Sequence, residues 1–241
     1  MIFLTGGSGL LGRELRRIWQ RKGIAYRWLH HRPAGGDIRD GKGMGRYLDR
    51  EIHLIVHCAA YTDVQRAQKE KALCYETNVT GTGNLASFGI PMLYISTEYV
   101  FDGERGGYRE NDAPDPQNFY ALTKLLGEYE SRRTKSCVVR CLFKPRPFEH
   151  PRACVDQFTT GDYIDVMARE IAFAISLFNR LPLTIHIGTE RKSTYELARR
   201  SRPDVGRIRL REIPVRLPRD TSLRTLLWER IKTENINRGK G

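Results

Sequence analysis

The sequence has little that would place the protein in a membrane or outside the cell. No apolar run in its 241 residues reaches the roughly 18 needed to span a bilayer, and the N-terminus lacks a signal peptide's basic segment, apolar stretch and cleavage site. The five cysteines form no CxxC pair, so we expect reduced thiols. No group of residues has metal-ligand spacing. These absences predict a cytoplasmic protein without a metal site.

The charge balance is basic, with 41 Lys and Arg against 28 Asp and Glu and a net charge of +13. Such an excess is compatible with nucleic acid, an anionic small molecule or only a solvated basic surface. Zinc-finger spacing, RNA-binding signatures and aromatic-interleaved basic repeats are absent. We therefore expect no specific nucleic-acid partner and favour a phosphate-rich ligand.

The N-terminal segment combines a short apolar strand, a glycine-rich turn and a helix. The pattern predicts a strand at residues 2–4, a turn at residues 5–12 (TGGSGLLG) and a helix at residues 13–21. Three glycines at this spacing allow a tight turn, close approach of the backbone to a pyrophosphate, and close packing of helix on strand. The turn therefore predicts a dinucleotide site, formed by Gly6, Ser8, Gly9, Leu10, Leu11 and Gly12.

The end of the second expected strand, residues 24–29, bears on the choice of dinucleotide. An NAD site would usually have an Asp or Glu about 20 residues beyond the glycines, where it binds the ribose 2′-hydroxyl. Residues 30–32 read His-His-Arg instead, and a positive end suits a 2′-phosphate. We expect NADP(H), with NAD(H) as the alternative; an exposed basic loop without cofactor contact is the competing interpretation. The expected contacts here are His31, Arg32, Asp37 and Ile38.

Strands and helices then alternate, with strands at 52–60 and 92–96 and a helix at about 75–88. This order predicts an α/β fold, a Rossmann-type doubly wound parallel sheet with right-handed crossovers. Ligands of such sheets bind at the carboxyl ends of the strands. Six further cofactor contacts are therefore expected at two strand ends: Cys58, Ala59, Ala60, Tyr61, Ile95 and Ser96.

Tyr120 and Lys124 are four positions apart in an expected helix. Side chains at i and i+4 lie one above the other, so the phenol and the ammonium can face one site. The ammonium would lower the phenol pKa from its usual value of about 10 and make the tyrosine a proton donor near neutrality. In most helices such a pair is only a surface contact, so the inference depends on the accompanying motifs.

Six motifs follow one another in the first 142 residues: residues 5–12, AAYTDV at 59–64, TNVTGT at 77–82, ISTEYVFDG at 95–103, YRE at 108–110 and NFYALTKLLGE at 118–128. In this order they resemble an extended short-chain dehydrogenase/reductase, closest to the dTDP-4-dehydrorhamnose reductase group. The resemblance implies reduction of a 4-keto nucleotide sugar by NAD(P)H in deoxysugar or polysaccharide synthesis, with a nucleotide-sugar 4-epimerase as the alternative. Many relatives form homodimers through helices equivalent to 75–88 and 119–134.

The resemblance also implies a catalytic set of Thr97, Tyr120 and Lys124, supported by Asn78. Hydride transfer to a ketone builds negative charge on the carbonyl oxygen. Thr97 would polarise that oxygen, Tyr120 would protonate it, and Lys124 would lower the tyrosine pKa and bind the nicotinamide ribose. Asn78 would support the lysine or a proton-relay water; a helix residue bonded to neighbouring backbone is the alternative.

The expected substrate contacts begin next to Thr97. One acid, Glu98, follows it, whereas the dehydratases of the superfamily have two, so simple reduction is favoured. Phe143 replaces the sugar-stacking tryptophan of the family. Two arginines near the C-terminus are candidates for a substrate diphosphate, with solvated side chains as the alternative. The full set is Thr97, Glu98, Tyr99, Phe143, Arg216 and Arg219.

The C-terminal part departs from the family. Residues 1–142 are expected to form the NAD(P)-binding Rossmann domain, and residues 143–241 a mixed region with a small, trimmed substrate-binding lobe and some elements that return to the sheet. Three prolines within residues 144–152 predict an extended loop. Because the lobe is trimmed, a non-catalytic, dinucleotide-binding regulatory subunit remains an alternative.

Overall fold

The protein is built around one parallel β-sheet. The structure, a computed structural model, describes residues 1–30 and 36–238. The sheet has the order β10-β5-β4-β3-β1-β2, with every neighbouring pair parallel, which confirms the predicted doubly wound fold. Its strands are β1 (Ile2–Thr5), β2 (Tyr26–Trp28), β3 (Leu54–His57), β4 (Met92–Thr97), β5 (Ser136–Cys141) and β10 (Thr184–His186).

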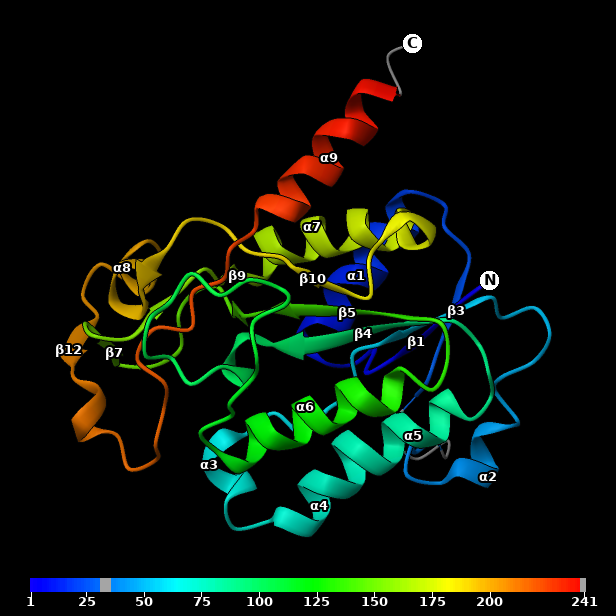
Figure 1. Ribbon diagram of the computed structural model, residues 1–241, viewed down its shortest axis with the longest axis horizontal. Coiled ribbons are helices and arrows are strands. Elements are labelled where there is room, and N and C mark those ends of the chain that lie inside the picture. Colours follow the sequence, from blue (N-terminus) through cyan, green and yellow to red (C-terminus); the bar gives the residue numbers. More distant parts are fainter. Residues whose placement is uncertain (31–35, 239–241) are drawn as a thin grey trace.

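Helices cover both faces of the sheet (Figure 1). Helices α1 (Leu10–Arg21) and α7 (Ile164–Ser176) lie on one face, and α5 (Gly81–Ala86) and α6 (Phe119–Ser131) on the other. Successive side chains of a strand point to opposite faces. Alternate residues of β1, β3, β4 and β5 therefore enter two separate cores, which explains why these strands read as continuous apolar runs.

The helix expected at about 75–88 begins earlier and is not regular. It consists of α4 (Lys71–Tyr75), a π-helical turn (Glu76–Thr80) and α5. A π turn inserts an extra residue into the helix and often marks a functional site. This one buries Asn78 and packs against α6.

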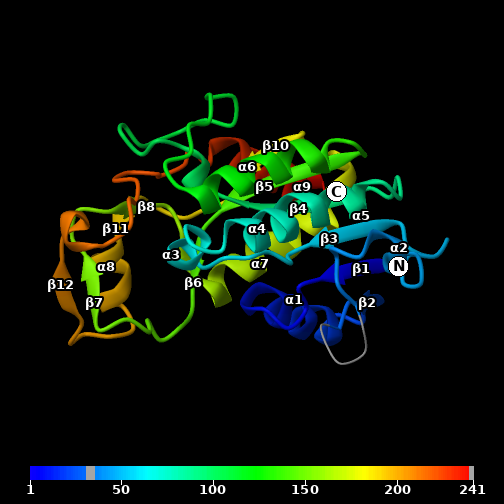
Figure 2. The same cartoon turned by 90° about the horizontal axis from the view of Figure 1, so that it is seen from below.

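Beyond β5 the chain enters a small lobe, returns to the sheet through α7 and β10, and then enters the lobe a second time. The lobe lies at one end of the molecule (Figure 2), and the short strand pairs β7 with β12 and β8 with β11 join its two passages, while β6 pairs with β9. Helix α8 begins with a capping box formed by Ser193 and Glu196. The remaining elements are α2 (Gly41–Met44), α3 (Val64–Ala67), β6 (Phe143–Lys144), β7 (Arg152–Cys154), β8 (Phe158–Thr159), β9 (Asp162–Tyr163), β11 (Lys192–Ser193), α8 (Thr194–Arg199), β12 (Gly206–Ile208) and α9 (Leu226–Arg238).

The segment that precedes α9 is bound to the loop that follows β4. The backbone N–H of Asp220 donates to the Gly103 carbonyl at 2.8 Å, and that of Tyr108 donates to the Ser222 carbonyl at 3.0 Å. Helix α9 then extends away from the body (Figure 1), anchored by the buried Trp228. Of the helices in the described part of the chain, none has the length and apolar character to cross a bilayer.

Candidate functional site

The glycine-rich turn after β1 lies directly on the end of β3. Gly6 has a φ of 69°, and a Cβ added there would lie 2.5 Å from the Ala59 nitrogen. A Cβ on Gly12 would lie 2.2 Å from the Gly6 carbonyl oxygen, so helix and turn need glycine at both positions. No side chain caps α1 at Gly9, and its first turn has no acidic residue. The N–H groups at the start of α1 are therefore available to an anion.

This turn lies at the switch point of the sheet. Strand β1 lies between β2 and β3, where the strand order reverses, and ligands of doubly wound sheets bind in the crevice there. Ser8 is exposed beside the crevice, and residues 58–61 are partly exposed. Several expected cofactor contacts are buried, among them Leu11, Ile95 and Ser96.

The expected contacts beyond β2 are only partly visible. His31 and Arg32 lie outside the described residues. Asp37 is paired with Arg39 at 2.6 Å, and Ile38 is buried against Gly81 of α5. The structure therefore brings together the turn and residues 58–61, while Asp37 and Ile38 are engaged within the protein.

A buried chain of hydrogen bonds, unrecognised in the sequence, connects the turn to the π-helical turn. The Thr5 hydroxyl is 2.7 Å from His57 Nδ1, and His57 Nε2 is 3.0 Å from the Thr82 hydroxyl. Thr82 donates to the Asn78 carbonyl at 2.7 Å, so it must accept from His57. His57 therefore carries its proton on Nε2, accepts from Thr5 at Nδ1 and is neutral.

We expect acid to weaken the fold through His57. Burial lowers its pKa from 6.5 to about 3, with Lys124 contributing in the same direction. Below pH 6.5 the unfolded chain takes up a proton on His57 and the folded chain does not. The contribution of His57 to the free energy of unfolding is therefore fully present above pH 6.5 and is lost as the pH falls toward 3. The loss approaches about 1.4 kcal/mol per pH unit. The free energy of unfolding, measured with urea at several pH values, should depend less steeply on pH in His57→Gln than in wild type.

The exposed His150 provides the control for this prediction, and His150→Gln should leave the dependence unchanged. Two other buried groups, His186 and Glu98, also make the free energy of unfolding depend on pH. His186, with its pKa lowered to about 3 by burial, acts in the same direction, whereas Glu98, with its pKa raised to about 7 by burial, favours the fold at low pH. Equal pH dependence in wild type and His57→Gln would contradict a neutral His57.

Thr97, Tyr120 and Lys124 come together at the carboxyl end of β4. Thr97 ends the strand, and its hydroxyl accepts from the Tyr99 N–H at 3.2 Å. Helix α6 begins after Asn118, which caps it by accepting from the Ala121 N–H at 2.9 Å. This start brings Tyr120 close enough to Thr97 for the threonine hydroxyl to act on the pKa of the tyrosine. The Lys124 ammonium donates to the Ile95 carbonyl at 2.8 Å.

The pKa of Tyr120 differs from the expectation. We expected Lys124 to lower it, and this is wrong, because burial raises it well above 10 and the Thr97 hydrogen bond opposes this only in part. The lysine is bonded to Ile95 instead, and burial lowers its own pKa to about 8. Tyr120 therefore keeps its proton at neutral pH, as a proton donor requires. An ammonium has three N–H groups, so Lys124 has donors left for a ligand.

Asn78 joins the loop after β3 to helix α6. Its side-chain oxygen accepts from the Tyr61 N–H at 2.7 Å, and its Nδ2 donates to the Tyr61 carbonyl at 3.1 Å and to the Thr123 hydroxyl at 2.9 Å. Thr123 in turn donates to the Tyr120 carbonyl at 2.8 Å. These bonds hold the Tyr61 loop against α6, and they position Tyr120 through its neighbour Thr123.

The residues expected to meet the sugar are mostly enclosed. Glu98 is fully buried and accepts from the Thr221 hydroxyl at 2.7 Å, so it is not placed to contact a sugar hydroxyl as we expected. Tyr99 is buried and accepts from Gln157 at 3.3 Å. Phe143 packs against the core on the α7 side of the sheet. Lys144, which the sequence did not single out, is close enough to Glu98 for each to shift the pKa of the other.

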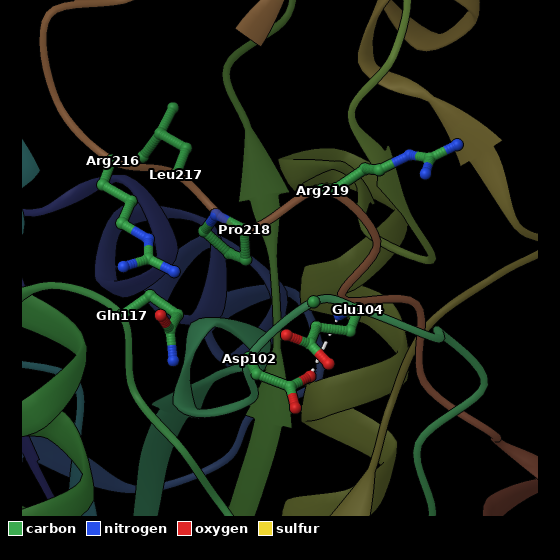
Figure 3. Close-up of a pocket in the computed structure, with 8 residues that line it drawn as sticks. Asp102, Glu104, Gln117, Arg216, Leu217, Pro218 and Arg219 are labelled. Carbon is green, nitrogen blue, oxygen red and sulfur yellow. Dashed lines mark hydrogen bonds between the residues drawn. The ribbon is translucent and has the colours of Figure 1, made fainter. Parts of the chain in front are cut away.

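A cavity of about 370 Å³ lies beyond the carboxyl end of β4. Arg216 and Arg219 both line it, but Figure 3 shows Arg216 directed toward Gln117 and Arg219 directed away. Because it is Arg216 that is directed into the cavity, this arginine is the better placed of the two to bind an anion (Figure 3). Within the described residues neither arginine forms an ion pair. The lining residues are Asp102, Gly103, Glu104, Gln117, Arg216, Leu217, Pro218 and Arg219.

This cavity is separate from the glycine turn. Gln117 is three residues before Tyr120, and Asp102 is five residues after Thr97. A cofactor on the turn and a second ligand in the cavity would therefore approach Tyr120 from different elements. Among residues 1–30 and 36–238, no group of His, Cys, Asp and Glu is arranged to hold a metal ion.

Several curated proteins align with the chain. Methionine adenosyltransferase 2 subunit beta from Bos taurus is 28% identical over 82% of this chain and 70% of its own length. The probable low-salt glycan biosynthesis reductase of Haloferax volcanii is 35% identical over 54% of this chain, and the dTDP-4-dehydrorhamnose reductase of Mycobacterium tuberculosis is 36% identical over 53%. The alignments span 48% and 44% of those two reductases, less than half of each.

The solved structures that share the fold include two reductases at 25% identity. A hypothetical dTDP-4-dehydrorhamnose reductase from Sulfolobus tokodaii superposes with a TM-score of 0.81 over 95% of this chain and 94% of its own. The dTDP-4-dehydrorhamnose reductase of Bacillus anthracis, solved in complex with NADP, superposes with a TM-score of 0.79 over 95% and 90%. These neighbours confirm the resemblance to the dTDP-4-dehydrorhamnose reductases.

The family model for the RmlD substrate binding domain matches residues 1–143. That span includes the glycine turn, β4 and α6, and so every residue of the predicted catalytic set. The chain belongs to the RmlD substrate binding domain family.

Proposed function

We propose that this protein is an NADPH-dependent reductase of a 4-keto nucleotide sugar. The observation that carries the proposal is the convergence of Thr97, Tyr120 and Lys124 at the end of β4, two strands from the glycine turn. The family match and the NADP complex of the Bacillus anthracis neighbour support the oxidoreductase class and the cofactor.

The chemistry follows from the protonation states. Bound NADPH would supply a hydride to the carbonyl carbon of the sugar. Tyr120, whose raised pKa keeps it protonated, would transfer its phenolic proton to the carbonyl oxygen as charge develops there. Thr97 would donate a hydrogen bond to the same oxygen, and Lys124 would hold the nicotinamide ribose with its free N–H groups.

The cavity beside Gln117 is the proposed place for the nucleotide part of the substrate. Arg216 faces into it without a carboxylate partner in the described residues, and a guanidinium can bind a diphosphate with two parallel hydrogen bonds. Arg219 points elsewhere and is not needed for this contact. NADPH oxidation with dTDP-4-keto-6-deoxyhexose and related sugars tests the proposal; no turnover with any sugar would contradict it.

A second candidate function is that of a non-catalytic subunit. The observation that favours it is the alignment with methionine adenosyltransferase 2 subunit beta, which covers 82% of this chain. Such a subunit would bind the dinucleotide without oxidising it in the presence of sugars. The chain's Thr97, Tyr120 and Lys124 and their mutual placement favour the reductase.

We also propose a homodimer formed by α4 and α6. These helices pack side by side (Figure 1), and they carry exposed apolar side chains, Leu73 and Tyr75 on α4 and Leu122 and Tyr129 on α6. Light scattering should show a dimer that becomes a monomer in Leu122→Glu/Tyr129→Glu. Leu183→Glu, at an exposed site before β10, is the control; a wild-type monomer would contradict the proposal.

A further inference from the structure

A cationic side chain lies against an aromatic ring at the end of β2. Arg16, on the second turn of α1, places its guanidinium carbon 3.8 Å from the Trp28 ring centroid. The His30 ring also contacts Trp28, with centroids 3.6 Å apart. Strand β2 ends at Trp28, so this cluster of Arg16, Trp28 and His30 marks the carboxyl end of the strand.

The cluster borders the glycine turn. Arg16 Nη1 donates to the Gly7 carbonyl at 3.3 Å. A Cβ on Gly7 would lie 2.4 Å from the Trp28 ring, so the ring packs directly on the turn. The guanidinium is therefore held between the turn, where a dinucleotide would bind, and the strand end that such a ligand reaches with its adenosine ribose.

Arg16 has more hydrogen-bond donors than the protein uses. A guanidinium has five N–H donors, and the contact with Gly7 is the single hydrogen bond that Arg16 makes among the described residues. Its Nε is buried without a partner, and it forms no ion pair in the described chain. A side chain fixed by stacking, with free donors beside a ligand crevice, is suited to bind an oxyanion in two-point contact.

The strand end also lacks the group that would select NAD. An NAD site places a carboxylate there for the ribose 2′-hydroxyl. Residues 26–30 contain none, and the single acid of the facing helix α1, Glu14, is paired with Arg17. The pyrophosphate would occupy the N-terminal end of α1 near Leu10, so Arg16, a turn and a half further on, is left for the ribose side.

We infer that Arg16, held on Trp28 with His30 beside it, binds the 2′-phosphate of NADP(H) and makes the protein select NADPH over NADH. The inference rests on the proposed dinucleotide site. It assigns the selectivity to the second turn of α1, a segment that the sequence did not single out. His30 adds a ring N–H donor next to the same position.

Calorimetric titration tests this without turnover. NADPH and NADH, and the fragments adenosine 2′,5′-bisphosphate and AMP, are titrated into wild type, Arg16→Leu and Arg13→Leu. Arg13 is the matched control, because it is on the same helix and also donates to the turn, to the Ser8 carbonyl at 3.1 Å. Thermal unfolding of each variant checks that it is folded.

In wild type we expect NADPH and the bisphosphate to bind roughly 10-fold to 100-fold more tightly than NADH and AMP, as charge-assisted contacts allow. Arg16→Leu should lose this ratio through weaker NADPH binding, with NADH unchanged, and Arg13→Leu should keep it. A ratio that survives in Arg16→Leu, or equal affinities in wild type, would overturn the inference and leave the proposed function standing. If wild type binds neither dinucleotide, both fall.

Discussion

Tyr120→Phe should lower kcat about 100-fold to 10,000-fold, the usual contribution of a positioned general acid. The phenol O–H is the group that would protonate the carbonyl oxygen, and phenylalanine keeps the ring while removing that proton. Because Lys124 is bonded to Ile95 rather than to Tyr120, the lysine should remain in place. Steady-state kinetics with NADPH and a 4-keto nucleotide sugar, beside a direct measurement of NADPH affinity, checks the prediction.

Tyr129→Phe is the matched control, since Tyr129 is on the same helix and is 56% exposed. It should turn over at the wild-type rate. The affinity of Tyr120→Phe for NADPH should stay close to that of wild type, because the dinucleotide contacts are assigned to the glycine turn, Arg16 and Lys124. A Tyr120→Phe enzyme with wild-type kcat would rule out the tyrosine as the acid.

Glu128→Gln should destabilise the fold by about 3–5 kcal/mol, the usual effect of removing one partner of a buried ion pair. Glu128 and Arg140 are 1% and 3% exposed and 2.7 Å apart, and Ser96 donates to the same carboxylate at 2.6 Å. The variant leaves the Arg140 charge buried without a counter-charge. For a chain of this size, Tm should fall by roughly 6–20 °C in calorimetry.

The double variant Glu128→Leu/Arg140→Met is the informative control. Replacing a buried pair by apolar residues of similar size is often neutral or stabilising, so the double variant should recover most of the lost Tm. If it remains as unstable as Glu128→Gln, the loss comes from the geometry that joins β4, β5 and α6 rather than from an uncompensated charge.

The fold was predictable because its signals are local and repeated. The apolar strands, the glycine turn and the alternation with helices specify a doubly wound sheet without any long-range information. The π-helical turn at Asn78 was missed, because an inserted residue changes the helical period for one turn only.

The site was predictable where a motif carries the chemistry. Tyr120 and Lys124 were found from their spacing, Thr97 came from the family resemblance, and the structure places the three at the carboxyl end of β4. The pKa values of Tyr120 and Lys124 were not predictable, because burial, which packing sets, is the largest cause of both shifts.

The ligand contacts outside the motifs needed three-dimensional information. In the sequence Arg16 is one of several arginines of α1, and only the fold places its guanidinium over the Trp28 ring. Glu98 was expected at the sugar but is enclosed by the returning segment, through Thr221, which is 123 residues further along the chain. Such pairings across the sequence leave no periodic signal.

The most direct test of the reductase proposal is the fate of the hydride. NADPH carrying deuterium at C4 of the nicotinamide is incubated with the protein and dTDP-4-keto-6-deoxyhexose, and the sugar product is examined by NMR and mass spectrometry. We predict deuterium on carbon 4 of the sugar, with one NADPH consumed per sugar, and none in the Tyr120→Phe reaction over the same time. Tight binding of NADPH with no deuterium in any 4-keto sugar would contradict the account.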